Sequence, residues 1–127
     1  MITATKDFAE NITGAPCTPV LCIEGKKLVV TSGTCCDDLD EQIPSDFKSQ
    51  AEMTLKACQK FLESAGCTFD DVFNVEVYLK DINNWTEFNA IYMEKFNRKV
   101  MPCRKAIQAV LLPGYELEVV MWAVSDK

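Results

Sequence analysis

Two residues of opposite charge, Arg104 and Glu118, stand out as candidates for chemistry because each lies in a mostly apolar segment. The segment from 101 to 124 predicts two strands joined by a turn at Pro113-Gly114. A guanidinium can hold a substrate carboxylate through two parallel hydrogen bonds, which a lysine cannot do. The alternatives are structural: an arginine paired with a nearby acid, and a glutamate at a strand edge that faces water.

The chain contains no histidine. This absence excludes Ser-His-Asp and Cys-His catalysis in their usual forms and removes the usual general base near neutral pH. Chemistry must therefore rely on carboxylates, lysine, arginine, hydroxyls or backbone groups. The seven cysteines include no CxxC pair, so we expect neither a disulfide framework nor a zinc site. They are interpreted mainly as small buried hydrophobes, with Cys35-Cys36 as an exposed, oxidisable pair.

If the last two strands pair around Pro113-Gly114, Glu118 lies opposite Ala109, and Arg104 lies about 16 Å further along. One small substrate cannot span that distance. The sequence thus predicts that Arg104 and Glu118 meet only when they come from different copies of the chain.

The composition predicts one globular domain over residues 1–127, with 48% hydrophobic and 25% charged residues. No apolar run approaches the ~20 residues that a membrane span needs, and the first residues do not resemble a signal peptide. A cytoplasmic protein is therefore expected. The formal charge of −6 disfavours nucleic acid as a partner.

Periodicity predicts the elements that must position the two charges. A hairpin is expected over 20–34, and a helix over 47–65, capped by Ser45 and ended by Gly66. The apolar face of that helix is Phe47, Ala51, Thr54, Leu55, Cys58, Phe61, Leu62 and Ala65. Alternation predicts a strand over 72–81 whose buried side is Phe73, Val75, Val77 and Leu79.

A second helix is expected after Asn84, which would cap it in a capping box with Glu87. Its apolar stripe is Trp85, Phe88, Tyr92 and Phe96. The order of elements predicts an α+β fold, a mixed sheet with two helices packed on one face. Residues 119–124 are apolar on both faces of the strand, so the face without helices calls for cover by another copy of the protein.

Several segments, taken in order, resemble the Rid (YjgF) family of reactive-intermediate deaminases. They are "VTSG" (30–33), "AGCTFDDVFNVEVYLKD" (65–81), "FNAIYMEKF" (88–96), "MPCR" (101–104) and "LPGYELEVVMWA" (112–123). The resemblance implies a homotrimer with a chorismate-mutase-like fold and ligand sites in the clefts between subunits. It implies hydrolysis of 2-enamino and 2-imino acids such as 2-aminoacrylate to 2-keto acids and ammonia. Neither a cofactor nor a metal is implied, and pyridoxal-phosphate enzymes would supply the substrates.

The resemblance also implies roles for individual residues. Arg104 follows Pro102-Cys103 where the family has its carboxylate-binding arginine, and Glu118 matches its water-positioning glutamate, one residue nearer the preceding proline. The positions that would bind substrate are Ser32, Gly33, Asn89, Ala106 and Ile107.

The chain also departs from the family pattern. The family's Gly-Pro-Tyr tyrosine has no counterpart in "APCTPVLC", Ala106 replaces a frequent cysteine, and Lys105 replaces a small residue. These departures bear on the substrate range and the rate. Three alternative functions also remain open. They are a non-catalytic trimer that binds small carboxylates or keto acids, a chorismate mutase, for which two arginines are few, and a ribonuclease, which the charge of −6 disfavours.

Overall fold

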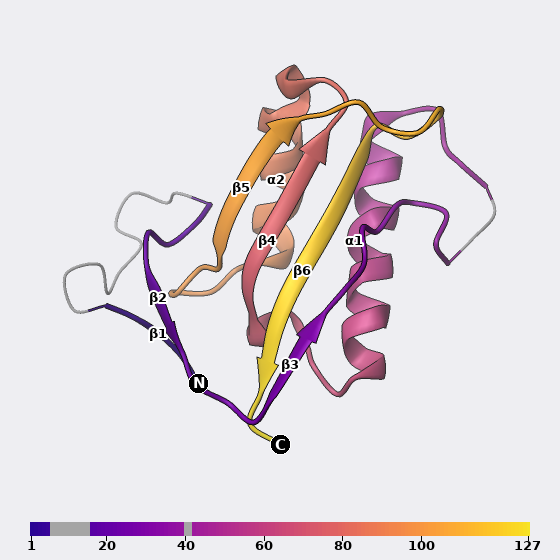
Figure 1. Ribbon diagram of the computed structural model, residues 1–127. Helices are drawn as coiled ribbons and strands as arrows, with labels where there is room; N and C mark the ends of the chain where they lie inside the picture. Colours follow the sequence, from indigo (N-terminus) through magenta and orange to yellow (C-terminus); the bar gives the residue numbers. More distant parts are fainter. Residues whose placement is uncertain (6–15, 40–41) are drawn as a thin grey trace.

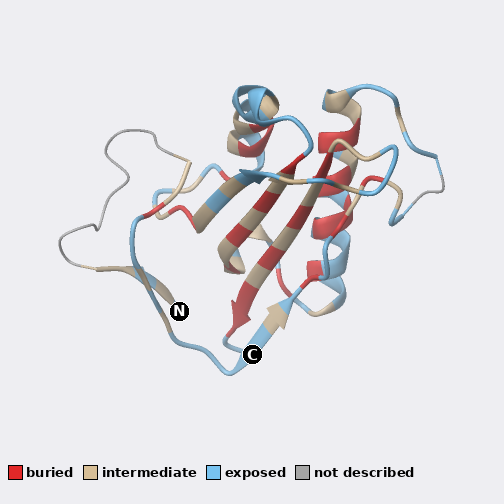
Figure 2. Cartoon of the chain, turned by 45° about the horizontal axis from the view of Figure 1, so that its top comes forward, coloured by how far each residue is buried: buried red, intermediate tan, exposed pale blue. Residues whose placement is uncertain are grey.

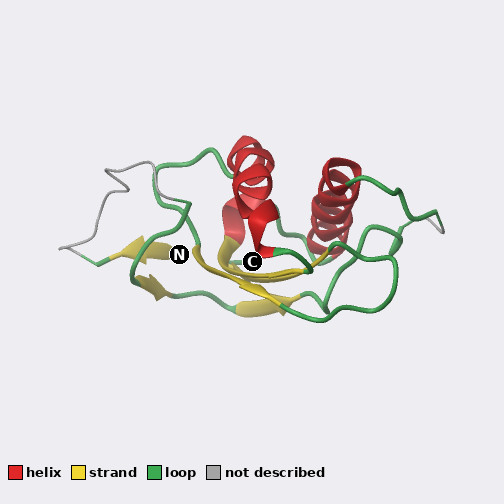
Figure 3. Cartoon of the chain, turned by 90° about the horizontal axis from the view of Figure 1, so that it is seen from above, coloured by secondary structure: helices red, strands yellow, loops and turns green. Residues whose placement is uncertain are grey.

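The computed structural model describes residues 1–5, 16–39 and 42–127. Two helices lie side by side on one face of a mixed four-stranded sheet of order β3-β6-β4-β5 (Figures 1 and 3). A separate two-stranded sheet pairs β1 with β2. The α+β fold with both helices on one face is as predicted. The strands are β1 (Ile2–Ala4), β2 (Leu21–Ile23), β3 (Lys27–Val30), β4 (Val72–Leu79), β5 (Cys103–Gln108) and β6 (Leu117–Ser125).

Helix α1 (Phe47–Ser64) forms where the apolar spacing predicts it. Its cap is Asp46 rather than Ser45, because the Asp46 carboxylate accepts a hydrogen bond from the Ser49 amide at 2.9 Å. Gly66 follows the helix with a φ of +80°, a conformation that favours glycine. The predicted face is buried except for Phe61, which is exposed, and Phe47 and Ala65, which are partly buried.

Helix α2 (Trp85–Lys95) begins after a short 3-10 turn, η3 (Ile82–Asn84). The predicted capping box does not form, because Asp81 caps η3 and the Asn84 side chain makes no capping bond. Phe88, Tyr92 and Phe96 are buried as predicted, whereas Trp85 is exposed. The apolar stripe of α2 therefore packs against the core from Phe88 onward.

The core lies between the helices and the inner faces of β4 and β6 (Figure 2). Val75, Val77 and Leu79 are fully buried, as the alternation predicts. Phe73 is only partly buried, because a β-bulge between Val72 and Asn74 shifts the pattern and buries Val72 instead. No helix in the described ranges is long and apolar enough to cross a membrane.

Both predicted hairpins are wrong. β2 pairs with β1, and β3 pairs with β6, so the strands flanking Glu24-Gly25-Lys26 lie in different sheets. β4 lies between β5 and β6, parallel to β5 and antiparallel to β6. The turn residues reverse the chain in both places, but in each the neighbouring strand comes from elsewhere in the sequence.

The face of the sheet without helices carries apolar side chains, and none of the described segments forms a second layer over them. Leu28 is 65% exposed, Val30 is 51% exposed and Ile107 is 44% exposed. Polar side chains gather around Glu76 on this open face: Lys105 pairs with its carboxylate at 3.1 Å, and the Trp122 indole donates to it at 3.3 Å. These contacts, the Lys105 bond foremost, hold the pKa of Glu76 below its ordinary value.

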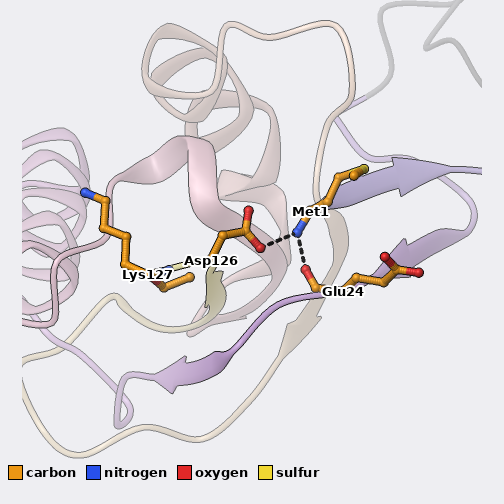
Figure 4. A network of polar contacts seen from close by, with 5 residues as sticks. Met1, Glu24, Asp126 and Lys127 are labelled. Carbon is orange, nitrogen blue, oxygen red and sulfur yellow. Dashed lines mark hydrogen bonds and ion pairs between the residues drawn. The ribbon is translucent and has the colours of Figure 1, made fainter.

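The first residues of the chain are tied to its last strand by an exposed polar network (Figure 4). The Met1 amino group donates to the Glu24 carbonyl and pairs with the Asp126 carboxylate at 2.9 Å. An ion pair this exposed contributes at most about 1 kcal/mol. Beside this network the Lys26 amide donates to the Ser125 carbonyl at 2.9 Å, which attaches the connection between β2 and β3 to the end of β6.

Arg98 fixes the connection that leads from α2 into β5. Its guanidinium donates to three backbone carbonyls, those of Val100, Phe69 and Val72. We expect Arg98→Met to lower the free energy of unfolding by on the order of 3 kcal/mol, because three charge-assisted bonds are lost together. Chemical denaturation measures this loss. Arg104→Met is the matched control, and an equal loss in both variants would contradict a special structural role for Arg98.

Candidate functional site

Arg104 lies on the helix-covered face of β5. Its register partner on β4 is Val75, whose side chain is fully buried beneath the helices. The Arg104 guanidinium carbon lies 4.8 Å from the centre of the Tyr92 ring and 5.8 Å from that of Phe88. Both rings come from α2, so the helix supplies an aromatic support for the cation.

No carboxylate of the described residues forms an ion pair with Arg104. Burial lowers the pKa of its guanidinium, which nevertheless remains charged at neutral pH. One of its terminal nitrogens, Nη1, is buried and has no hydrogen-bond partner. A half-buried cation without a counter-ion is suited to an anionic ligand.

Among the described residues, three other buried polar atoms also lack a hydrogen-bond partner: Thr18 Oγ1, Asn89 Oδ1 and the Tyr92 hydroxyl. Asn89 lies on α2 between Phe88 and Tyr92, the two residues that support Arg104. The Thr18 amide donates to the Pro102 carbonyl at 3.1 Å, which brings its segment to the start of β5. Native proteins leave few buried polar groups unpaired, so these four atoms on meeting segments indicate a site for a polar ligand.

Glu118 lies on the opposite face, next to the chain that follows β3. A Cβ atom added to Gly33 would lie 2.5 Å from Glu118 Oε1, so the carboxylate packs directly against this glycine. Ser32 precedes it, and the Ser32 carbonyl accepts a hydrogen bond from the Thr34 hydroxyl at 2.9 Å. The predicted residues Ser32, Gly33 and Glu118 thus form one group.

A cavity of about 280 Å³ adjoins Glu118. It is lined by Cys35, Val110, Leu111, Leu112, Tyr115 and Glu118. Burial, and then the charge of Glu118, raise the pKa of the Cys35 thiol to about 12, so this thiol is protonated at neutral pH and is not a nucleophile. Cys36 is buried, and the predicted exposed Cys35-Cys36 pair is therefore wrong.

The remaining predicted positions lie on the Arg104 strand. Ala106 is on the helix-covered face beside Val77, where it packs against the core. Ile107 is on the open face beside Tyr78. Of the seven predicted residues, the structure therefore groups Arg104 with Asn89 and, separately, Glu118 with Ser32 and Gly33.

Arg104 and Glu118 are separated within one chain for a different reason from the one predicted. Arg104 aligns with Val75 and Glu118 with Tyr78, on either side of β4. Three residues along the strand and two strand spacings across give about 14 Å between backbones. An offset of three residues also places the two side chains on opposite faces of the sheet.

Sequence reasoning missed Thr18 and Tyr92. In the sequence Tyr92 belongs to the apolar stripe of α2, and the available signal of a polar role is its hydroxyl group. Thr18 follows Pro16-Cys17, in the segment that lacks the family tyrosine. Its position beside Pro102 follows from tertiary contact alone.

Comparison with known proteins relates the chain to a protein family. A RutC family protein of Pyrococcus horikoshii is 37% identical over 73 residues, which span 58% of this chain and 57% of the relative. A RutC family protein of Haemophilus influenzae is 31% identical over 100 residues, 73% of this chain and 77% of the relative. TdcF of Escherichia coli, a candidate reactive intermediate deaminase, is 29% identical over 102 residues, 76% of this chain and 78% of the relative.

Solved structures of similar proteins have the same fold. The crystal structure of Escherichia coli TdcF with bound serine matches with a TM-score of 0.72 and 26% identity, over 80% of this chain and 84% of that one. A Rid family protein from Yersinia pestis matches with a TM-score of 0.71 and 23% identity, over 98% and 99%, which supports the fold alone. The family model described as Endoribonuclease L-PSP matches residues 18–125, and the chain therefore belongs to this family of Rid and YjgF proteins.

Proposed function

We propose that the protein hydrolyses reactive 2-imino and 2-enamino acids, such as 2-aminoacrylate, to 2-keto acids and ammonia. The reaction takes place in clefts between the subunits of a chorismate-mutase-like homotrimer. The protein acts in the cytoplasm on intermediates that pyridoxal-phosphate enzymes release, and it uses no cofactor of its own. Its relative TdcF is a candidate reactive intermediate deaminase whose crystal structure holds serine, a small amino acid with a carboxylate.

The observation that carries the proposal is Arg104. It is a half-buried cation with no carboxylate partner among the described residues, and its Nη1 atom has no hydrogen-bond partner. The unpaired polar atoms of Thr18, Asn89 and Tyr92 lie on the segments that surround it. A small carboxylate that also bears a polar nitrogen matches this set of groups.

Imines hydrolyse readily, so the protein needs mainly to position the substrate and a water molecule. A water oxygen adds to the imine carbon as the nitrogen takes up a proton, and the resulting carbinolamine expels ammonia as the hydroxyl loses its proton to give the ketone. Arg104 holds the carboxylate, and Glu118 accepts a hydrogen bond from the attacking water. An enamine must first take up a proton at carbon to become the imine.

Arg104 and Glu118 contribute to one site only if they come from different subunits. Their positions on opposite faces of one sheet support this arrangement. Leu28 and Val30 on β3 and Ile107 on β5 are exposed apolar side chains on the open face, and they support assembly through it.

One alternative is a non-catalytic trimer that binds small carboxylates or keto acids. Arg104 would serve that function equally well, and only the role of Glu118 distinguishes the two. A ribonuclease activity, which the family description suggests, is disfavoured by the formal charge of −6.

A coupled assay tests the proposal. A pyridoxal-phosphate dehydratase generates 2-aminoacrylate from serine, and the rate of pyruvate formation is followed after a rapid quench of the dehydratase. We expect the protein to shorten the lifetime of 2-aminoacrylate in proportion to its concentration. An unchanged lifetime, together with measurable binding of pyruvate, would support the binder instead.

Gly33→Ala is expected to lower kcat/KM by about tenfold without unfolding the protein. The new methyl group would overlap the Glu118 carboxylate, whose flexible side chain must then move away from its position. Steady-state kinetics and a thermal melt measure both effects. In a Glu118→Ala background the same substitution should have no further effect, because the overlap is gone. Full activity of Gly33→Ala would show that the carboxylate position is not critical.

A further inference from the structure

The hydroxyl group of Tyr92 is not explained by packing in the core. Its side chain is fully buried, yet its hydroxyl has no hydrogen-bond partner. Its ring stacks on Phe96 at 4.5 Å and supports the Arg104 guanidinium at 4.8 Å. A phenylalanine would supply the same packing and the same support without burying an unpaired hydroxyl.

We infer that Tyr92 is a ligand-binding residue whose hydroxyl donates to the carboxylate that Arg104 holds. This inference rests on the proposed function and adds a residue to its site. Burial raises the pKa of the Tyr92 hydroxyl, so it stays neutral and remains a donor at any physiological pH. A neutral donor beside a cation suits an anionic ligand, since a phenolate would compete with the ligand for Arg104.

A carboxylate can accept about four hydrogen bonds, more than one guanidinium supplies. Arg104 offers a fork of donors, Tyr92 a hydroxyl from α2, and Thr18 a hydroxyl from the segment beside Pro102. Thr18 is only 4% exposed, and its Oγ1 is also unpaired. The two hydroxyls therefore complete the shell of donors around the anion, each from a different segment.

The inference predicts that Tyr92→Phe stabilises the empty protein and weakens ligand binding. The melting temperature should rise by about 3 °C, because an unpaired buried hydroxyl is removed. KM for 2-aminoacrylate and the Kd for pyruvate, measured by calorimetry, should each rise about tenfold, with kcat within twofold of the parent. Thr18→Val, which replaces the hydroxyl with a methyl group, should show the same pattern.

Tyr78→Phe is the matched control, since the Tyr78 hydroxyl already donates to Glu76 at 3.4 Å on the open face. It should not raise the melting temperature and should leave the Kd for pyruvate unchanged. If Tyr92→Phe binds pyruvate like the parent while Arg104→Ala does not, the inference is wrong and the proposed function stands. If the parent protein binds no pyruvate and hydrolyses no 2-aminoacrylate, both are wrong.

Discussion

Replacing Arg104 with alanine should lower kcat/KM for 2-aminoacrylate by about 100-fold and leave the protein as stable as the parent. The loss in activity follows from the removal of a bidentate, charge-assisted contact, worth on the order of 3 kcal/mol. The free energy of unfolding should not fall, because the half-buried Arg104 guanidinium has no carboxylate partner in the described structure. Arg98, by contrast, donates to backbone carbonyls. Steady-state kinetics and chemical denaturation separate the two effects.

Arg104→Lys tests whether geometry or charge matters. Lysine retains the charge but loses the planar fork and its stacking on the Tyr92 ring. We expect it to restore little activity over Arg104→Ala. Parental rates in the lysine variant would mean that Arg104 acts only as a charge or lies outside the site.

The helices could be predicted because their signals are local. The apolar spacing of residues 47–62 and the glycine at position 66 predict α1 from neighbouring residues alone. The errors at the ends are also local: Asp46 competes with its neighbour Ser45 for the cap, and a 3-10 turn at Ile82–Asn84 takes the place of a capping box.

Strand partners could not be predicted in the same way. Pro113-Gly114 and Glu24-Gly25-Lys26 both mark turns of the chain, and each is typical of a hairpin. The sheet instead inserts β4 between β5 and β6, and it brings β3 from the first third of the chain to pair with β6. Such pairing depends on which faces the helices bury, information that no single segment contains.

The residues of the candidate site can likewise be predicted only in part. Arg104 and Asn89 could be proposed from motifs, and the structure places both around the same aromatic residues of α2. Tyr92 could not, because in sequence its ring counts as apolar and only the structure reveals an unpaired hydroxyl. The hairpin used to predict that Arg104 and Glu118 cannot share a site within one chain is wrong. The separation instead follows from the structure, in which Arg104 on β5 and Glu118 on β6 lie on opposite faces of the sheet.

Mixed assemblies of two impaired variants should therefore regain activity. In Arg104→Ala alone every site lacks the carboxylate-binding group, and in Glu118→Gln alone every site lacks the carboxylate that positions water. When the two are refolded together in equal amounts, a subunit with intact Arg104 can face a neighbour with intact Glu118. Two independent halves multiply, so about one quarter of the sites should be active if assembly is random.

The refolded mixture is measured in the coupled assay, and native mass spectrometry determines its composition. Each variant refolded alone is the control and should keep only its own low activity. Arg104→Ala combined with Glu118→Gln in one chain, refolded with the parent protein, should also give about one quarter active sites, because only parent–parent interfaces are intact. Confirmed mixed assemblies without recovery would place both residues in a site within one chain. Since the Arg104 and Glu118 side chains leave opposite faces of one sheet, that result would require a large rearrangement of β5 or β6.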